Sequence, residues 1–116
     1  MAQILGYLAL DEADYFQQYA AELRLDRTAL ANLLIVRELR IDRLAELKPR
    51  YDRDLAGMKK TKVVAHQADS VTKIDFKAHA DDCGLKPSRA AAILFRAELT
   101  ERWLEASMDR KSFDSS

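Results

Sequence analysis

The apolar residues at the start of the chain follow two different spacings. A short apolar run at positions 3–10 is rich in strand-forming residues and too brief for a helix, so it predicts a β-strand. Beyond it, Phe16, Tyr19, Ala20 and Leu23 recur at intervals of three and four residues. This spacing predicts a helix over about residues 11–23, with Asp11 as its N-cap.

A longer helical pattern follows. Asp26 is a suitable N-cap, and leucines recur at helical spacing over residues 30–47, which predicts a second helix of about twenty residues. Lys48-Pro49 is expected to end this helix, because proline disfavours the helical conformation in the residue before it. Residues 48–60 are mostly polar and contain a glycine, so we assign them to a linker.

The same order of elements begins again after the linker. Residues 61–67 predict a strand, and the helical pattern that follows extends to about Cys83. Gly84 stands where a left-handed residue commonly ends a helix, and Pro87 suits the first turn of the next helix. That last helix is predicted over about residues 88–108.

A shift of the sequence by 60 residues, without a gap, superposes the two halves. It aligns similar residues, most of them on faces that the periodicity assigns to the core: Ile4 with Val64, Phe16 with Phe76, Ala20 with Ala80, Leu34 with Leu94, and Glu38 with Glu98. Chance register between amphipathic helices is the alternative, but three elements and a turn match at one offset. We therefore predict a single domain over 1–116, made of strand-helix-helix units 3–47 and 61–108, the linker 48–60 and a frayed tail, 109–116.

This order of elements resembles the ribbon-helix-helix family, which includes the MetJ, Arc and CopG repressors. The local match is strongest over residues 76–99, where 83–88 is similar to the family's turn. Two copies in one chain are similar to the TraY proteins of conjugative plasmids. The resemblance implies a mainly α fold with a short two-stranded antiparallel β-ribbon, a tandem β-α-α-β-α-α pseudo-dimer. A strand-swapped dimer of two chains is the alternative arrangement.

The resemblance also implies a function. It predicts a DNA-binding protein that is a transcriptional repressor or an accessory factor of plasmids or mobile elements, with the ribbon in the major groove of double-stranded DNA. Two strand registers stay open. One exposes Gln3, Leu5, Tyr7, Ala9, Val63, Ala65 and Gln67, and the other exposes Ile4, Gly6, Leu8, Lys62, Val64 and His66. The candidates for base contacts are Gln3, Lys62 and Gln67, and an ordinary surface role is the alternative for each.

Contacts with DNA phosphates are the second implication of the resemblance. Amides and basic residues at the start of each long helix would bind an anion, as would a run of lysines before the second strand. The candidates are Lys86, Ser88, Arg89, Arg27, Lys59 and Lys60. Asp26 would repel phosphate in the first half, and simple helix capping or a solvated linker explains the same residues without DNA.

The apolar character of the strands supports a competing hypothesis. The fold could have become a protein-protein interaction module that no longer reads DNA through its ribbon, and that self-associates or binds a protein partner. The candidate interface residues are Leu5, Tyr7, Val63, Ala65 and Trp103.

Composition and motifs bear on DNA binding, catalysis, metal binding and cellular location. The 19 basic and 19 acidic residues balance, so DNA binding must depend on local placement of charge. We find no motif for catalysis and expect a non-enzyme without a cofactor. His79 and Cys83 are four residues apart, but Cys83 aligns with an apolar position, so we expect no metal site. One cysteine and no long apolar run indicate a cytoplasmic protein.

Overall fold

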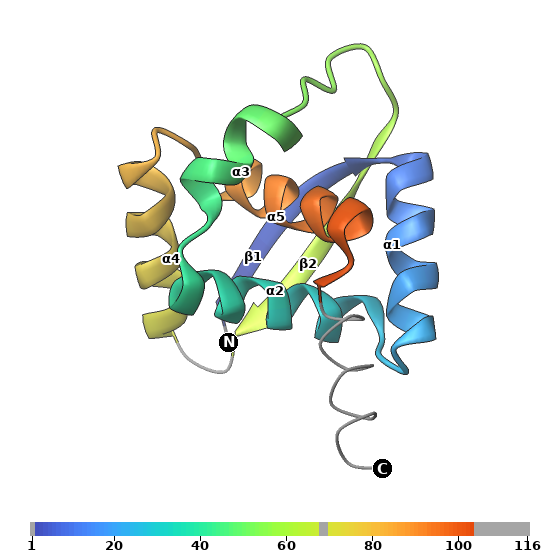
Figure 1. Ribbon diagram of the computed structural model, residues 1–116, viewed down its shortest axis with the longest axis horizontal. Coiled ribbons are helices and arrows are strands. Elements are labelled where there is room, and N and C mark those ends of the chain that lie inside the picture. The colour runs from blue at the N-terminus through green and yellow to red at the C-terminus, as the bar shows by residue number, and fades with distance from the viewer. Residues whose placement is uncertain (1, 68–69, 104–116) are drawn as a thin grey trace.

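A two-stranded antiparallel sheet lies at the centre of the fold in the computed structural model, which describes residues 2–67 and 70–103 (Figure 1). The elements in chain order are β1 (Ala2–Ala9), α1 (Leu10–Glu22), α2 (Arg27–Ile41), α3 (Leu44–Tyr51), β2 (Lys60–Gln67), α4 (Ser70–Asp82) and α5 (Pro87–Glu101). The predicted mainly helical fold with a short antiparallel ribbon is confirmed. The predicted order is not matched fully, because three helices follow the first strand.

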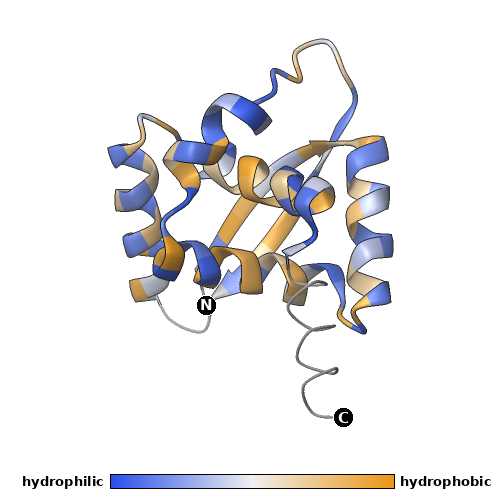
Figure 2. Cartoon of the chain, in the orientation of Figure 1, coloured by the Kyte–Doolittle hydropathy of each residue, from blue (hydrophilic) through white to orange (hydrophobic). Residues whose placement is uncertain are grey.

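The helices cover one face of the sheet. Helix α5 packs mainly on β1, and α2 packs mainly on β2. Helices α1 and α4 lie on opposite sides of α2 and α5 (Figure 1). Apolar residues concentrate in the strands and on the helix sides that face them (Figure 2). One cluster of buried side chains draws on both halves of the chain, including Phe16, Phe76 and Phe95. Within residues 2–67 and 70–103, no helix is long and apolar enough to cross a lipid bilayer.

The helices recur at the offset of 60 residues that the sequence predicts. Helices α1 and α4 span 10–22 and 70–82, and α2 and α5 span 27–41 and 87–101. The left-handed residues that end them recur too: Arg24 (φ 62°) matches Gly84 (φ 72°), and Asp42 (φ 52°) matches Arg102 (φ 51°). The two halves therefore match in the positions of their helix ends as well as in their buried residues.

The strands do not follow the 60-residue correspondence. Ile4 is buried and pairs with Ala65, whereas Val64 pairs with Leu5 on the opposite, partly exposed face. The predicted match of Ile4 with Val64 is therefore wrong, because these two side chains lie on opposite faces of the ribbon. The first strand follows one predicted register and the second strand follows the other. Strand β1 is largely apolar on both faces, and β2 places Val64 on its outer face beside Val63 and Ala65 on the buried face, so the pattern of apolar residues left both registers open.

The predicted long helix of the first half is two helices. Helix α2 ends where Asp42 turns left-handed, and the buried carboxylate of Glu38 accepts hydrogen bonds from the backbone N–H groups of Arg43 (3.0 Å) and Leu44 (2.8 Å). These bonds satisfy amides at the start of α3 that have no helical partner. The prediction that Pro49 ends the helix is also wrong, because Pro49 lies inside α3 and the connection to β2 begins only at residue 52.

Two buried glutamates join the halves of the chain. Glu98 of α5 accepts a hydrogen bond from the hydroxyl of Tyr19 in α1 at 2.6 Å, and another from the guanidinium of Arg37 at 2.8 Å. At the matching position, Glu38 of α2 lies 2.6 Å from Nε2 of His79 in α4. Each first helix is therefore tied to the second helix of the other half by a buried carboxylate, whose desolvation these partners offset.

The junction between β1 and α1 is held by a third glutamate. The N-cap of α1 is Ala9, and the predicted cap, Asp11, lies within the first turn. The Glu12 carboxylate accepts hydrogen bonds from the Ala9 N–H at 2.9 Å and from Nε of the largely buried Arg96 at 2.7 Å. Arg96 also donates to the carbonyl of Tyr51, so one side chain connects α5, the start of α1 and the end of α3.

Candidate nucleic-acid interface

The outer face of the ribbon, opposite the helices, is the candidate interface. Its cross-strand pairs are Gln3 with His66, Leu5 with Val64, and Tyr7 with Lys62. Gln3, Tyr7 and Lys62 are exposed, and the other three side chains are partly exposed. This outer face, defined by these six residues, therefore presents an apolar pair at its centre and polar groups on either side.

The outer face holds both donors and cations. The side-chain nitrogen of Gln3 lies 3.4 Å from Nδ1 of His66, so the two polar groups at one end are in contact. At the other end, the Lys60 ammonium lies 5.5 Å from the centre of the Tyr7 ring, within range of a cation-π interaction. Among the described residues, Lys59, Lys60 and Lys62 form no ion pair with a carboxylate.

The start of α5 adjoins the ribbon edge formed by β1. Lys86 is the N-cap of α5, Pro87 occupies its first turn, and no side chain caps the first amides. Lys86 and Ser88 line a cavity of about 310 Å³ together with Tyr7 and Lys60. Unpaired amides and the helix dipole favour an anion at such a helix start.

Arg89 lines the same cavity but is engaged. Its Nε lies 2.6 Å from a carboxylate oxygen of Asp52, and this hydrogen bond, with the charge of Asp52, raises the pKa of Arg89. Of the predicted phosphate contacts in this region, Lys86, Ser88 and Lys60 are thus available to an anion, whereas Arg89 would first have to leave Asp52.

The start of α2 differs from the start of α5. The Asp26 side chain accepts a hydrogen bond from the backbone N–H of Ala29 at 2.7 Å, which confirms the predicted N-cap. Arg27 follows it and is partly buried. The carboxylate occupies the place where an anion would bind at α5, so the two helix starts differ in charge as the sequence predicts.

Several predicted site residues lie elsewhere. Val63 and Ala65 are fully buried beneath the helices, so their assignment to an exposed protein interface is wrong. The backbone of Gln67 pairs with Ala2, and its side chain lies outside the described residues. Trp103 is 42% exposed, and the guanidinium of Arg43 lies 3.8 Å from the centre of its ring.

Sequence reasoning did not place His66 and Val64 among the candidate contacts, although they share the outer face with Lys62. Their alternation with Val63 and Ala65 indicates that they share one face of the strand. The alternation does not say which of the two faces is buried against the core. Comparison of the chain with protein-family models, with curated proteins and with solved structures gives no match.

Proposed function

We propose that the protein binds double-stranded DNA through the outer face of its ribbon, as a ribbon-helix-helix protein with both halves in one chain. It would act as a transcriptional repressor or as an accessory factor of plasmids or mobile elements. The observation that carries the proposal is the outer face, where a two-stranded antiparallel ribbon presents Gln3, Tyr7 and Lys62 to solvent.

The chemistry of the outer face suits the major groove. The groove is wide enough for a two-stranded ribbon, and a glutamine can form a bidentate contact with adenine and a lysine with guanine. The paired Leu5 and Val64 at the centre of the face would meet thymine methyl groups. Gln3 and Lys62 are therefore the proposed base contacts.

Although the chain is neutral overall, lysines lie close to the ribbon. Lys59 directly precedes β2, Lys60 is its first residue, and Lys86 lies at the start of α5 beside the ribbon edge. These lysines would meet the phosphates that border the groove. Since Asp26 occupies the corresponding helix start in the first half, we expect the phosphate contacts to be stronger on the α5 side.

A gel-shift titration with mixed-sequence duplexes at two salt concentrations tests the proposal. Binding should weaken steeply with salt. Lys86→Ala, at a proposed phosphate contact, should weaken binding and lower the salt slope by about one, whereas Lys62→Ala, at a proposed base contact, should weaken binding with little change in the slope. Arg50→Ala, which removes an exposed charge from α3, is the matched control and should leave binding unchanged. Absence of binding at low salt would exclude the proposal.

A protein-binding role for the same face is the second candidate. The observation that favours it is the apolar Leu5-Val64 pair beside Tyr7, which is 40% exposed. On this hypothesis Tyr7→Asp should change the oligomeric state measured by light scattering, with helical content unaltered. If the wild-type chain is a monomer that Tyr7→Asp leaves unchanged, self-association through this face is excluded.

A further inference from the structure

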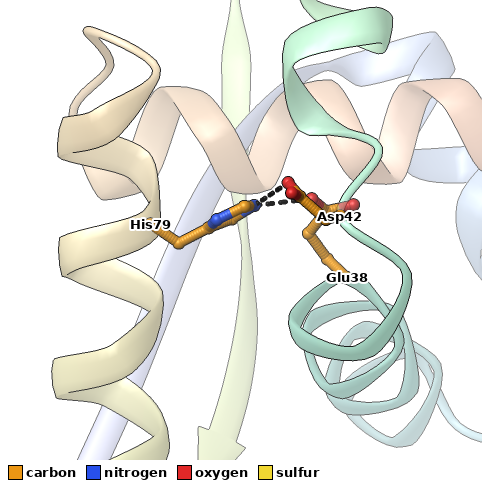
Figure 3. Close-up of side chains that lie close together, drawn as sticks. All are labelled: Glu38, Asp42 and His79. Carbon is orange, nitrogen blue, oxygen red and sulfur yellow. Dashed lines mark hydrogen bonds and ion pairs between the residues drawn. The ribbon is translucent and has the colours of Figure 1, made fainter.

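Three potential metal ligands meet where the end of α2 approaches α4 (Figure 3). Nε2 of His79 lies 2.6 Å from Oε2 of Glu38 and 3.4 Å from Oδ1 of Asp42. One ligand atom from each of the three side chains lies within 4.8 Å of the other two. The imidazole points at both carboxylates, and imidazole nitrogen with carboxylate oxygen is a donor set that first-row transition metals accept.

The other half of the chain provides an internal comparison. Sixty residues away, the positions of Glu38, His79 and Asp42 correspond to Glu98, Tyr19 and Arg102. There the buried Glu98 is satisfied by the Tyr19 hydroxyl and the Arg37 guanidinium, so a structural contact at this place needs neither an imidazole nor a second carboxylate. The guanidinium of Arg102 lies 4.5 Å from the centre of the Tyr19 ring. One half thus places a cation where the other half places an anion.

The charge around the three residues also favours a cation. Within the described part of the chain, His79 is the one basic side chain that pairs with either Glu38 or Asp42. The nearby Arg43 directs its guanidinium to Glu101 and Glu46 instead. Lys48 donates to the carbonyl of Cys83 at 3.0 Å. Two carboxylates therefore share one imidazole.

We propose that Glu38, Asp42 and His79 bind a divalent transition-metal ion, for which Zn²⁺ is the natural probe. On binding, Nε2 coordinates the metal as part of a neutral ring whose proton is on Nδ1, any further ring proton goes to solvent, and the metal takes the position between Nε2 and Oε2. The remaining coordination position is filled by water. This site is independent of the proposed DNA interface, which lies on the outer face of the ribbon.

The distances require only a small adjustment. With bonds of about 2.0–2.2 Å, tetrahedral ligand atoms lie roughly 3.3 Å apart. The separation between His79 and Asp42 already fits this value, and that between His79 and Glu38 must widen by about 0.7 Å. The Asp42 side chain is 76% exposed, so it can move and leaves a path for the ion from solvent. Oε1 and Oε2 of Glu38 keep their bonds to the N–H groups of Arg43 and Leu44, which orient the ligand.

Calorimetric titration of the full chain with Zn²⁺ tests the proposal. We expect one ion per chain and a rise in melting temperature with added metal. His79→Tyr restores the residue of the other half, preserving a donor to Glu38 while removing the metal ligand, and Asp42→Asn removes the exposed ligand. Each variant should lower the affinity at least about tenfold, and circular dichroism should show that both remain folded.

Two matched controls separate this site from adventitious binding. Cys83→Ser removes the one cysteine, and His66→Asn removes the other histidine, which lies on the ribbon. Both should bind Zn²⁺ as the wild type does. The proposal is overturned if the wild type takes up no metal, if His79→Tyr and Asp42→Asn bind as tightly as wild type, or if a control variant is the one that loses affinity.

Discussion

Tyr19 and Glu98 lie 79 residues apart in the sequence, yet the tyrosine hydroxyl donates a 2.6 Å hydrogen bond to the glutamate inside the core. Both side chains are buried, with exposures of 0% and 1%. Since a buried carboxylate must be satisfied by donors, this contact fixes how α1 of the first half meets α5 of the second.

Tyr19→Phe tests how much this contact stabilises the fold. The variant keeps the ring but removes a donor from a buried carboxylate, which should lower the free energy of unfolding by about 1–3 kcal/mol. Urea denaturation measures the difference. Tyr15→Phe in the same helix, at an exposed position, should change stability by less than about 0.5 kcal/mol. Equal effects of the two changes would contradict a structural role for the Tyr19 hydroxyl.

Glu12 should make the stability depend on acid. Burial raises the pKa of Glu12, but hydrogen bonds from Arg96, Ala9 and Arg53 outweigh burial, so the pKa lies below its ordinary value of 4.5. A depressed pKa in the folded state means that the stabilisation is present above about pH 4.5 and is lost as the pH falls through the folded-state pKa.

Glu12→Gln should therefore be less stable than wild type at neutral pH by roughly 1–3 kcal/mol. The difference should begin to shrink below about pH 4.5, where Glu12 of the unfolded chain becomes protonated, and should be lost below the lower pKa of the folded state. Urea denaturation at a series of pH values measures it. Glu46→Gln, at an exposed carboxylate on α3, is the control and should show little difference at any pH. A gap between Glu12→Gln and wild type that stays constant into acid would disprove this role.

Gly6 is required by close packing of β1 against α5. A Cβ atom at this position would lie 2.6 Å from Cε2 of Phe95 and 3.1 Å from the backbone nitrogen of Ala92. Gly6→Ala should therefore destabilise the protein by about 1–3 kcal/mol through overpacking. In a double-mutant cycle with Phe95→Leu, the combined loss should be smaller than the sum of the single losses, because the smaller side chain leaves room. Strict additivity would show that the ring is not the obstacle.

Arg24 and Gly84 occupy matching turns with positive φ, and they should respond oppositely to substitution. Arg24 has a φ of 62°, a conformation that costs a residue with Cβ roughly 1–2 kcal/mol. Arg24→Gly removes this conformational cost, but glycine loses more entropy than arginine on folding, which reduces the gain. The variant should therefore be more stable than wild type by about 0.5–1 kcal/mol. Thermal unfolding measures this change.

Gly84→Ala is the counterpart and should destabilise by about 1 kcal/mol. The added Cβ would lie 3.7 Å from the Lys48 ammonium, an ordinary contact, so its cost is conformational and not steric. If both changes shift the melting temperature in the same direction, the shared left-handed turn does not control stability at these positions.

The candidate interface illustrates where inference from the sequence stops. The alternative strand registers and the family resemblance predict Gln3 and Lys62 as base contacts, but they do not predict all of their neighbours on the outer face. His66 joins them only because Val63 and Ala65, and not Val64, are the residues that the helices cover. The metal-site candidate was missed for a related reason. Spacing along one helix pointed to Cys83, whereas the partners of His79 come from α2.

The sequence by itself determined where α1, α2, α4 and α5 begin, their 60-residue recurrence and the left-handed turn at Gly84, because these depend on residues within a few positions of one another. Tertiary structure decided the buried face of each strand, the break at Asp42 and the pairing of Glu38 and Glu98 with the opposite half. These features depend on contacts between residues far apart in the chain. A strand that is apolar on both faces, or a glutamate on a helix, takes its place only when another element covers it.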